Sequence, residues 1–175
     1  MLGLAQRGFS LAKPENHLAN FLKNNGYTTC LSGIQHEYGW YLDLEENGLH
    51  DLGYENILTT SSKEFVKEDL HIWDRDNAME VVKWLDNYDK EKPFFIAYGM
   101  HSTHRPYPIK VLDKIDERYV KPIFPITNNE ENRHDHAQFM TTAYYADENI
   151  KLILDALKRN KLYEDTVITV SYTHL

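Results

Sequence analysis

The amino-acid sequence predicts an α/β fold built on a mostly parallel β-sheet. Helical and strand-like segments alternate along the chain in the order helix, strand, helix, strand, helix, strand, which is typical of layered α/β folds. Two of the strand segments are nearly continuous apolar runs, as in parallel strands that are covered on both faces. The length of 175 residues and the apolar share of 42% are those of one globular domain with its own core.

The first helix and strand are predicted over residues 14–25 and 27–31. Pro14 suits the first turn of a helix, and Gly26 favours its end. The following strand segment is rich in β-forming residues and is closed by a Ser-Gly turn signal. The apolar face of this helix would consist of Leu18, Phe21 and Leu22.

The second helix and strand follow a mixed region, residues 37–73, where we expect loops with short strands. Helical spacing begins at Asp74, and an apolar strand is predicted over residues 94–98 after Pro93. The residues that hold the helical spacing are Ala78, Val81, Val82 and Leu85.

The third helix follows residues 101–132, a proline-rich stretch that we expect to form a long extended connection. Apolar residues keep helical spacing from Phe139 to about Arg159, and this is the strongest helical pattern of the chain. A buried strand is predicted over residues 166–170. Together the segments indicate a mostly parallel sheet with helical layers.

Histidines follow each of the three predicted strands. His36 comes after the first strand, His101 and His104 after the second, and His174 after the third. Because working sites lie beyond the carboxyl ends of parallel strands, we expect these side chains at one edge of the sheet. Imidazole transfers protons near neutral pH and binds metals. The remaining histidines are interpreted as solvated or locally hydrogen-bonded: His17, His50, His71, His134 and His136.

Composition and motifs argue against several other functions. The formal charge of −8 and the absence of a basic stripe argue against nucleic-acid or anionic-membrane binding. No apolar run approaches the length of a membrane span. Cys30 is the only cysteine, so neither an intrachain disulfide nor a cysteine-based zinc site can form. It lies among β-forming residues and is interpreted as a core residue rather than a nucleophile.

Four blocks of the sequence resemble the sulfatase family of the alkaline-phosphatase-like superfamily. Residues 22–36 resemble the block L-K-x-x-G-Y-x-T…G-K-x-H, and residues 93–107 resemble P-F-F-L…P-H-x-P. Residues 144–168 resemble the helix and strand that lead into the metal-binding S-D-H-G. Residues 3–9 look like the segment after the active-site helix in bacterial sulfatases related to heparan N-sulfatase.

The resemblance implies a three-layer α/β/α sandwich and the chemistry of sulfatases. Sulfatases use a formylglycine nucleophile made from cysteine in C-x-P-S-R or C-x-A-S-R, and Ca²⁺ holds the sulfate oxygens. By position, His36 matches the histidine that works on the formylglycine diol, and His104 matches the histidine that can protonate the leaving group. His174 aligns with a metal ligand of D-H-G. The implied substrate is a small-molecule or carbohydrate sulfate, as an ester or a sulfamate.

The chain also departs from the family pattern. It contains no C-x-P-S-R or C-x-A-S-R, and it lacks the paired aspartates that hold Ca²⁺. Ile34 stands where many sulfatases have lysine, and Thr173 and Leu175 replace the aspartate and glycine of S-D-H-G. We therefore expect residues 1–175 to be an internal, partial catalytic domain that lacks its formylglycine segment and its C-terminal part. The chain alone is expected to be inactive.

Two alternatives to a sulfatase stay open. One is a phosphonate or phosphate ester hydrolase of the same superfamily, which would carry threonine or serine in place of the upstream cysteine. The other is a degenerate sulfatase-like domain kept for binding. Relatives are commonly exported or lysosomal, so a periplasmic or extracellular location is expected for the parent protein.

Overall fold

A computed structural model describes residues 8–39, 46–60 and 70–171 of the chain. Its α-helices and strands, in chain order, are α1 (Leu18–Asn24), β1 (Thr28–Gly33), α2 (Glu46–Asp51), β2 (Asn56–Ile57), α3 (Leu70–Asp86), β3 (Phe94–Gly99) and α4 (Glu130–Arg159). Short 3-10 helices, η1 (Pro14–Asn16), η3 (Glu117–Tyr119) and η4 (Tyr163–Asp165), precede α1, α4 and the last described segment.

The described strands form one parallel sheet in the order β2-β1-β3. Strand β1 pairs with β3 along its full length, from Thr28 opposite Phe94 to Gly33 opposite Gly99. Because the two strands are parallel and end in register, the segments that follow them leave the sheet at the same edge. The predicted parallel sheet is therefore confirmed, and both predicted strands that it contains have the expected places.

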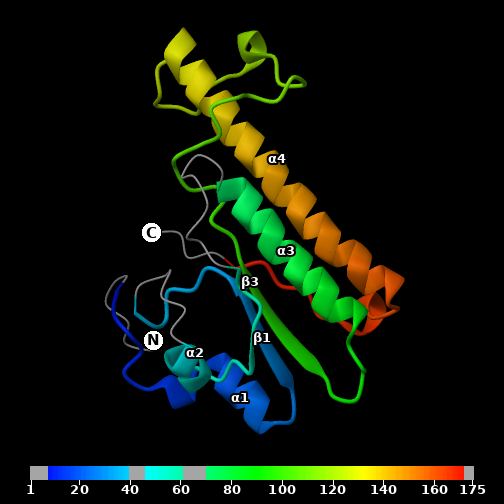
Figure 1. The fold of residues 1–175 in the computed structure, drawn as a ribbon. Coiled ribbons are helices and arrows are strands. Elements are labelled where there is room, and N and C mark those ends of the chain that lie inside the picture. The colour runs from blue at the N-terminus through cyan, green and yellow to red at the C-terminus, as the bar shows by residue number, and fades with distance from the viewer. Residues whose placement is uncertain (1–7, 40–45, 61–69, 172–175) are drawn as a thin grey trace.

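Side chains of β3 alternate between two apolar clusters, one on each face of the sheet. Phe95 and Ala97 pack against the cluster that includes residues of α1 and α2, whereas Phe94 and Ile96 pack against the cluster that includes residues of α3 and α4. Figure 1 shows α1 and α2 on one side of the sheet, with α3 and the long α4 side by side on the other. This arrangement is the three-layer α/β/α sandwich that the sequence resemblance implies.

Two helices begin earlier than the sequence pattern predicts. Helix α3 begins at Leu70, so Asp74 lies within its second turn and not at its start. Helix α4 begins at Glu130, because the Asn129 side chain accepts a hydrogen bond from the Asn132 amide at the N-terminus. Two acidic residues in the first turn add a favourable interaction with the helix dipole. Capping and charge, which apolar spacing does not record, therefore set the start of α4.

The mixed region 37–73 contains the expected short strand, β2, and also helix α2, which the sequence pattern did not predict. The third predicted strand, residues 166–170, is wrong for this structure, which assigns no strand there. Val167 is 90% exposed and Val170 is 85% exposed. A β-branched apolar run becomes a buried strand only when a neighbouring strand pairs with it and layers cover it. None of the described strands pairs with this segment.

Candidate active site

Two glycines bring the segments after β1 and β3 together. Gly33 and Gly99 are the last paired residues of the two strands, and the Ile34 amide donates to the Gly99 carbonyl oxygen at 2.9 Å. A Cβ atom on Gly33 would lie 2.0 Å from that same oxygen, and Gly33 has a φ of +84°. A Cβ atom on Gly99 would lie 2.0 Å from the Ile34 carbonyl oxygen. Only glycine at both positions permits this backbone approach.

The loop after β1 carries His36 and is organised by the buried side chain of Gln35. The Gln35 side-chain oxygen accepts hydrogen bonds from the amides of Glu37 and Tyr38, both at 2.8 Å, and its nitrogen donates to the Tyr38 carbonyl at 2.7 Å. The His36 amide donates to the Glu37 carboxylate at 2.9 Å. The backbone around the half-buried His36 is therefore held by side chains of its own loop.

The segment after β3 carries two histidines that face each other. The rings of His101 and His104 lie 5.2 Å apart between centroids, edge to face. The His104 amide donates to the His101 carbonyl at 2.9 Å, which closes a turn between them. The Asp74 carboxylate, on α3, accepts from the amides of His101 and Ser102, both at 2.7 Å. The buried Asp74 carboxylate of α3 therefore holds this turn in place.

Neighbouring charged groups and burial both act on the pKa of His101. Burial lowers the pKa of His101 from its ordinary value, and proximity to His104 lowers it further. The Asp74 carboxylate acts in the opposite direction, and His36 also lowers this pKa. Because β1 and β3 end in register, the loops that carry His36 and the histidine pair leave the sheet at the same edge.

The predicted site residues therefore divide into two groups. His36 and His104 leave the sheet at one edge, as the sequence analysis expected, and the His104 ring lies beside that of His101. His174 lies outside the described residues.

Of the histidines interpreted as locally bonded, His17 caps the N-terminus of α1 by accepting from the Ala19 amide. The ring nitrogens of His50 and His134 contact the Tyr54 carbonyl and the Glu117 carboxylate respectively, whereas His71 stacks on Tyr145 and His136 on Phe139.

Two polar residues of α3 support the site and were missed by the sequence analysis. Asp74 and Asn77 are both fully buried. Asn77 ties the end of β1 to the helix, because its carbonyl accepts from the Ser32 hydroxyl at 2.9 Å and its side-chain oxygen accepts from the Thr60 amide at 2.8 Å. Both residues lie on the helix face that carries the apolar stripe from Ala78 onward. A polar residue on an otherwise apolar face is the sequence signal that could have identified them.

The segment beyond His104 continues along α4. Arg105 donates two hydrogen bonds to the carboxylate of Asp135, both at 2.6 Å, and its guanidinium lies 4.5 Å from the centre of the Tyr107 ring. Arg105 holds the pKa of the Asp135 carboxyl below its usual value through these hydrogen bonds. The candidate site is therefore bordered on this side by a paired charge rather than by a lone cation.

Cys30 is a core residue, as the sequence analysis interpreted it. It is fully buried in β1, and burial raises the pKa of its thiol to about 12. At pH 8 only about 10⁻⁴ of such a thiol is ionised, and the thiolate is the reactive form. We predict that the folded chain reacts with a thiol-specific disulfide reagent at least about 100-fold more slowly than the chain in denaturant. Equal rates in absorbance assays of the two states would contradict the burial of Cys30.

The described residues do not fit a Ca²⁺ site. Ca²⁺ takes six to eight oxygen ligands, usually with several carboxylates. No group of three His, Cys, Asp or Glu side chains that could hold a metal occurs among residues 8–39, 46–60 and 70–171. At the candidate site, Asp74 is already occupied by two backbone amides, and Glu37 accepts from the His36 amide. No step of the chemistry is therefore assigned to a cation held by these residues.

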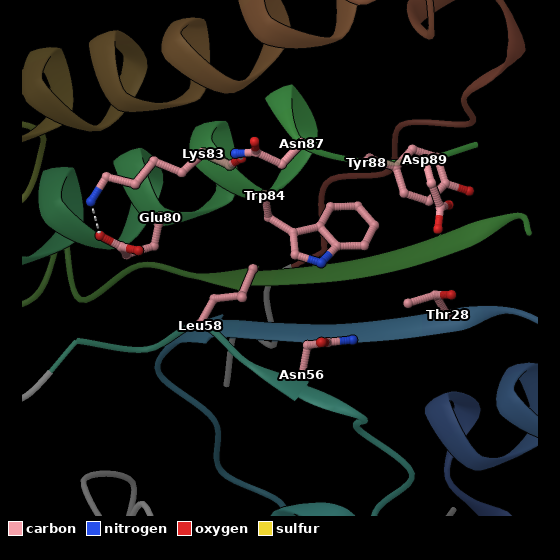
Figure 2. Close-up of a pocket in the computed structure, with 9 residues that line it drawn as sticks. All are labelled: Thr28, Asn56, Leu58, Glu80, Lys83, Trp84, Asn87, Tyr88 and Asp89. Atoms are coloured by element: carbon pink, nitrogen blue, oxygen red, sulfur yellow. Dashed lines mark hydrogen bonds and ion pairs between the residues drawn. The ribbon is translucent and has the colours of Figure 1, made fainter. Parts of the chain in front are cut away.

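A groove lies elsewhere in the fold, between α3 and the sheet. Figure 2 shows the Trp84 ring over this groove, with Leu58 and Asn56 on the opposite side and Thr28 at the start of β1. The Glu80 and Lys83 side chains form an ion pair along α3. None of the candidate histidines lines this groove. The groove extends from Thr28, at the start of β1, to Leu58, which follows β2, and its lining residues differ from those of the candidate active site.

Comparison with protein families identifies a match over nearly the whole chain. A family model described as Sulfatase matches residues 3–171 of the chain. None of the curated proteins matches it. In the parts of the chain that the structure describes, no helix is both long and apolar enough to cross a membrane. The match includes both histidine-bearing loops and every described helix and strand.

Proposed function

The chain belongs to the sulfatase family, whose members are sulfuric ester hydrolases, and on this premise we propose that it carries the proton-transferring histidines of a sulfatase site. The substrate we propose is a sulfate ester or sulfamate of a sugar. The single observation that supports this proposal most strongly is the convergence of His36, His101 and His104 beyond two paired parallel strands. Proton transfer at the carboxyl edge of a parallel sheet is the chemistry that such a cluster can perform.

His104 is the proposed general acid. Hydrolysis of a sulfate ester breaks the bond between sulfur and the bridging oxygen, and the departing oxygen needs a proton. The Nδ1 atom of His104 lies at hydrogen-bond distance from the Arg105 carbonyl, which can only accept, so Nδ1 carries a hydrogen. Nε2 is then the atom that gains and releases the proton. The His104 side chain is also exposed, as contact with a substrate requires.

His36 is the proposed acceptor of the proton from the attacking oxygen. When one proton moves from that oxygen to His36 and another moves from His104 to the leaving oxygen, the net reaction is R–O–SO₃⁻ + H₂O → R–OH + HSO₄⁻. Both imidazoles return to their starting states when a proton passes between them through solvent. His101, half-buried beside His104, would support this arrangement without itself meeting the substrate.

The nucleophile and the cation are proposed to come from outside residues 1–175. The sequence contains no C-x-P-S-R or C-x-A-S-R, and the described residues do not fit Ca²⁺. The family uses formylglycine and Ca²⁺, which supply the attacking oxygen and hold the sulfate. In this proposal the chain is a partial catalytic domain of a larger sulfatase, and it has no turnover alone.

The proposal is tested by assaying two proteins with an aryl sulfate and with the matching aryl phosphate in the presence of Ca²⁺. One protein is the 175-residue chain, for which we expect no turnover of either compound. The other is produced from a reading frame that also encodes the segment before Met1, in cells that form formylglycine, and we expect it to hydrolyse the sulfate. Phosphate turnover exceeding sulfate turnover in the longer protein would favour the phosphoester alternative. Sulfate turnover by the 175-residue chain would show that it contains its own nucleophile.

A further inference from the structure

Asp74 holds the turn after β3 through both of its carboxylate oxygens. One oxygen accepts from the His101 amide and the other from the Ser102 amide, each at 2.7 Å. The Asp74 side chain is fully buried, on a helix face that carries mostly apolar residues besides Asn77. A buried carboxylate is costly unless hydrogen bonds satisfy it, and two consecutive amides provide such bonds.

The surrounding contacts make Asp74 a rigid support. The Tyr98 hydroxyl, at the end of β3, donates to the Asp74 carbonyl at 2.7 Å. One turn further along α3, the Asn77 carbonyl accepts from the Ser32 hydroxyl at the end of β1. Helix α3 therefore holds the ends of both strands from which the histidine-bearing loops depart.

We propose that Asp74 is a positioning residue, which fixes the turn from His101 to Ser102 so that the His101 and His104 rings lie edge to face. The importance of Asp74 for catalysis rests on the proposed function, whereas its effect on the loop does not. The carboxylate touches no substrate in this account and acts only through the backbone of the loop. Removing one of its accepting oxygens while keeping its shape should release the turn.

A second effect of Asp74 must be separated from positioning. Its negative charge raises the pKa of His101, whereas burial and the nearby His104 lower it. If Asp74 acts by charge alone, its neutralisation leaves the loop in place and lowers the pKa of His101. If Asp74 holds the loop, neutralisation exposes His101 and separates it from His104, which raises the pKa toward its ordinary value of 6.5. The direction in which the pKa of His101 changes therefore distinguishes the charge effect of Asp74 from its positioning effect.

The test compares Asp74→Asn with Asp76→Asn, an exposed position two residues along the same helix. Amide hydrogen exchange and histidine titration are measured by NMR on the 175-residue chain. In Asp74→Asn we expect the His101 and Ser102 amides to exchange at least tenfold faster, the Ile34 amide to exchange as in the wild type, and the pKa of His101 to rise. Asp76→Asn should change none of these. Unchanged exchange, or a fall in the pKa of His101, would overturn the proposal.

The wild-type chain supplies a test that needs no variant to fold. Its His101 and Ser102 amides should exchange at least tenfold more slowly than exposed loop amides of comparable sequence, such as those of Thr103 and Arg105. Exchange of all four at similar rates would overturn the positioning role. Neither measurement uses enzymatic activity. A failure of the positioning role is therefore distinguishable from a negative sulfatase assay, which tests the proposed function alone.

Discussion

Replacing Gly33 with alanine is expected to lower the free energy of unfolding by about 3 kcal/mol. Gly33 has a φ of +84°, and its added Cβ would lie 2.0 Å from the Gly99 carbonyl oxygen. That oxygen also accepts from the Ile34 amide, so the strand ends cannot separate without losing this hydrogen bond. Urea denaturation followed by circular dichroism measures the loss.

Gly26→Ala is the matched control for this prediction. Gly26 has a φ of +86°, nearly that of Gly33, but a Cβ atom there would meet nothing within 4 Å. Only the cost of placing alanine at a positive φ applies, so we expect the free energy of unfolding to fall by about 1 kcal/mol. Equal losses for the two variants would contradict the close approach of β1 and β3, and with it the shared edge on which the candidate site depends.

Replacing His104 with alanine is expected to reduce kcat for a sulfate ester with a poor leaving group by about 10²–10⁴-fold in the sulfatase-competent protein. A proton on the leaving oxygen matters most when that oxygen is strongly basic, as in an alkyl sulfate. With a nitrophenyl sulfate, whose leaving group is stable as an anion, the loss should be at least about tenfold smaller. Steady-state kinetics with both substrates measures this difference.

Two further variants make this result specific. His36→Ala should reduce kcat for both substrates by similar factors, because His36 is proposed to act on the attacking oxygen. His134→Ala, in the exposed part of α4, should leave both rates unchanged. If His104→Ala reduced kcat by the same factor for alkyl and nitrophenyl sulfates, the result would contradict the role of His104 as the acid for the leaving group.

The sequence was sufficient to predict the parts of the fold that have strong local signals. The β-forming and apolar runs that became β1 and β3 lie between helical layers, with β1 buried and β3 half-buried, so residue type and environment agree. The rule that sites lie beyond parallel strands then placed His36 and His104 at one edge, because both strands end in register. Turn and glycine signals at Gly26 and Gly33 marked the ends of α1 and β1.

Other features depend on contacts that are distant in sequence. The run 166–170 has the composition of a buried strand, but composition cannot say whether a neighbouring strand is present to pair with it. Asp74 was interpreted as the start of a helix because helical spacing of apolar residues follows it. Its true partners are the amides of His101 and Ser102, 27 and 28 residues further along the chain. Only the folded arrangement reveals that this acid supports the histidine turn.

The candidate site requires His36 and His104 to lie at the same edge of the sheet as His101, and the pKa of His101 reports on both neighbours. In the folded wild-type chain, NMR titration should place this pKa below 6.5. The account predicts that His36→Ala and His104→Ala each raise it, with the larger rise in His104→Ala, whereas His134→Ala has no effect. A His101 pKa that does not change when His36 is removed would place the two loops apart and contradict the shared site.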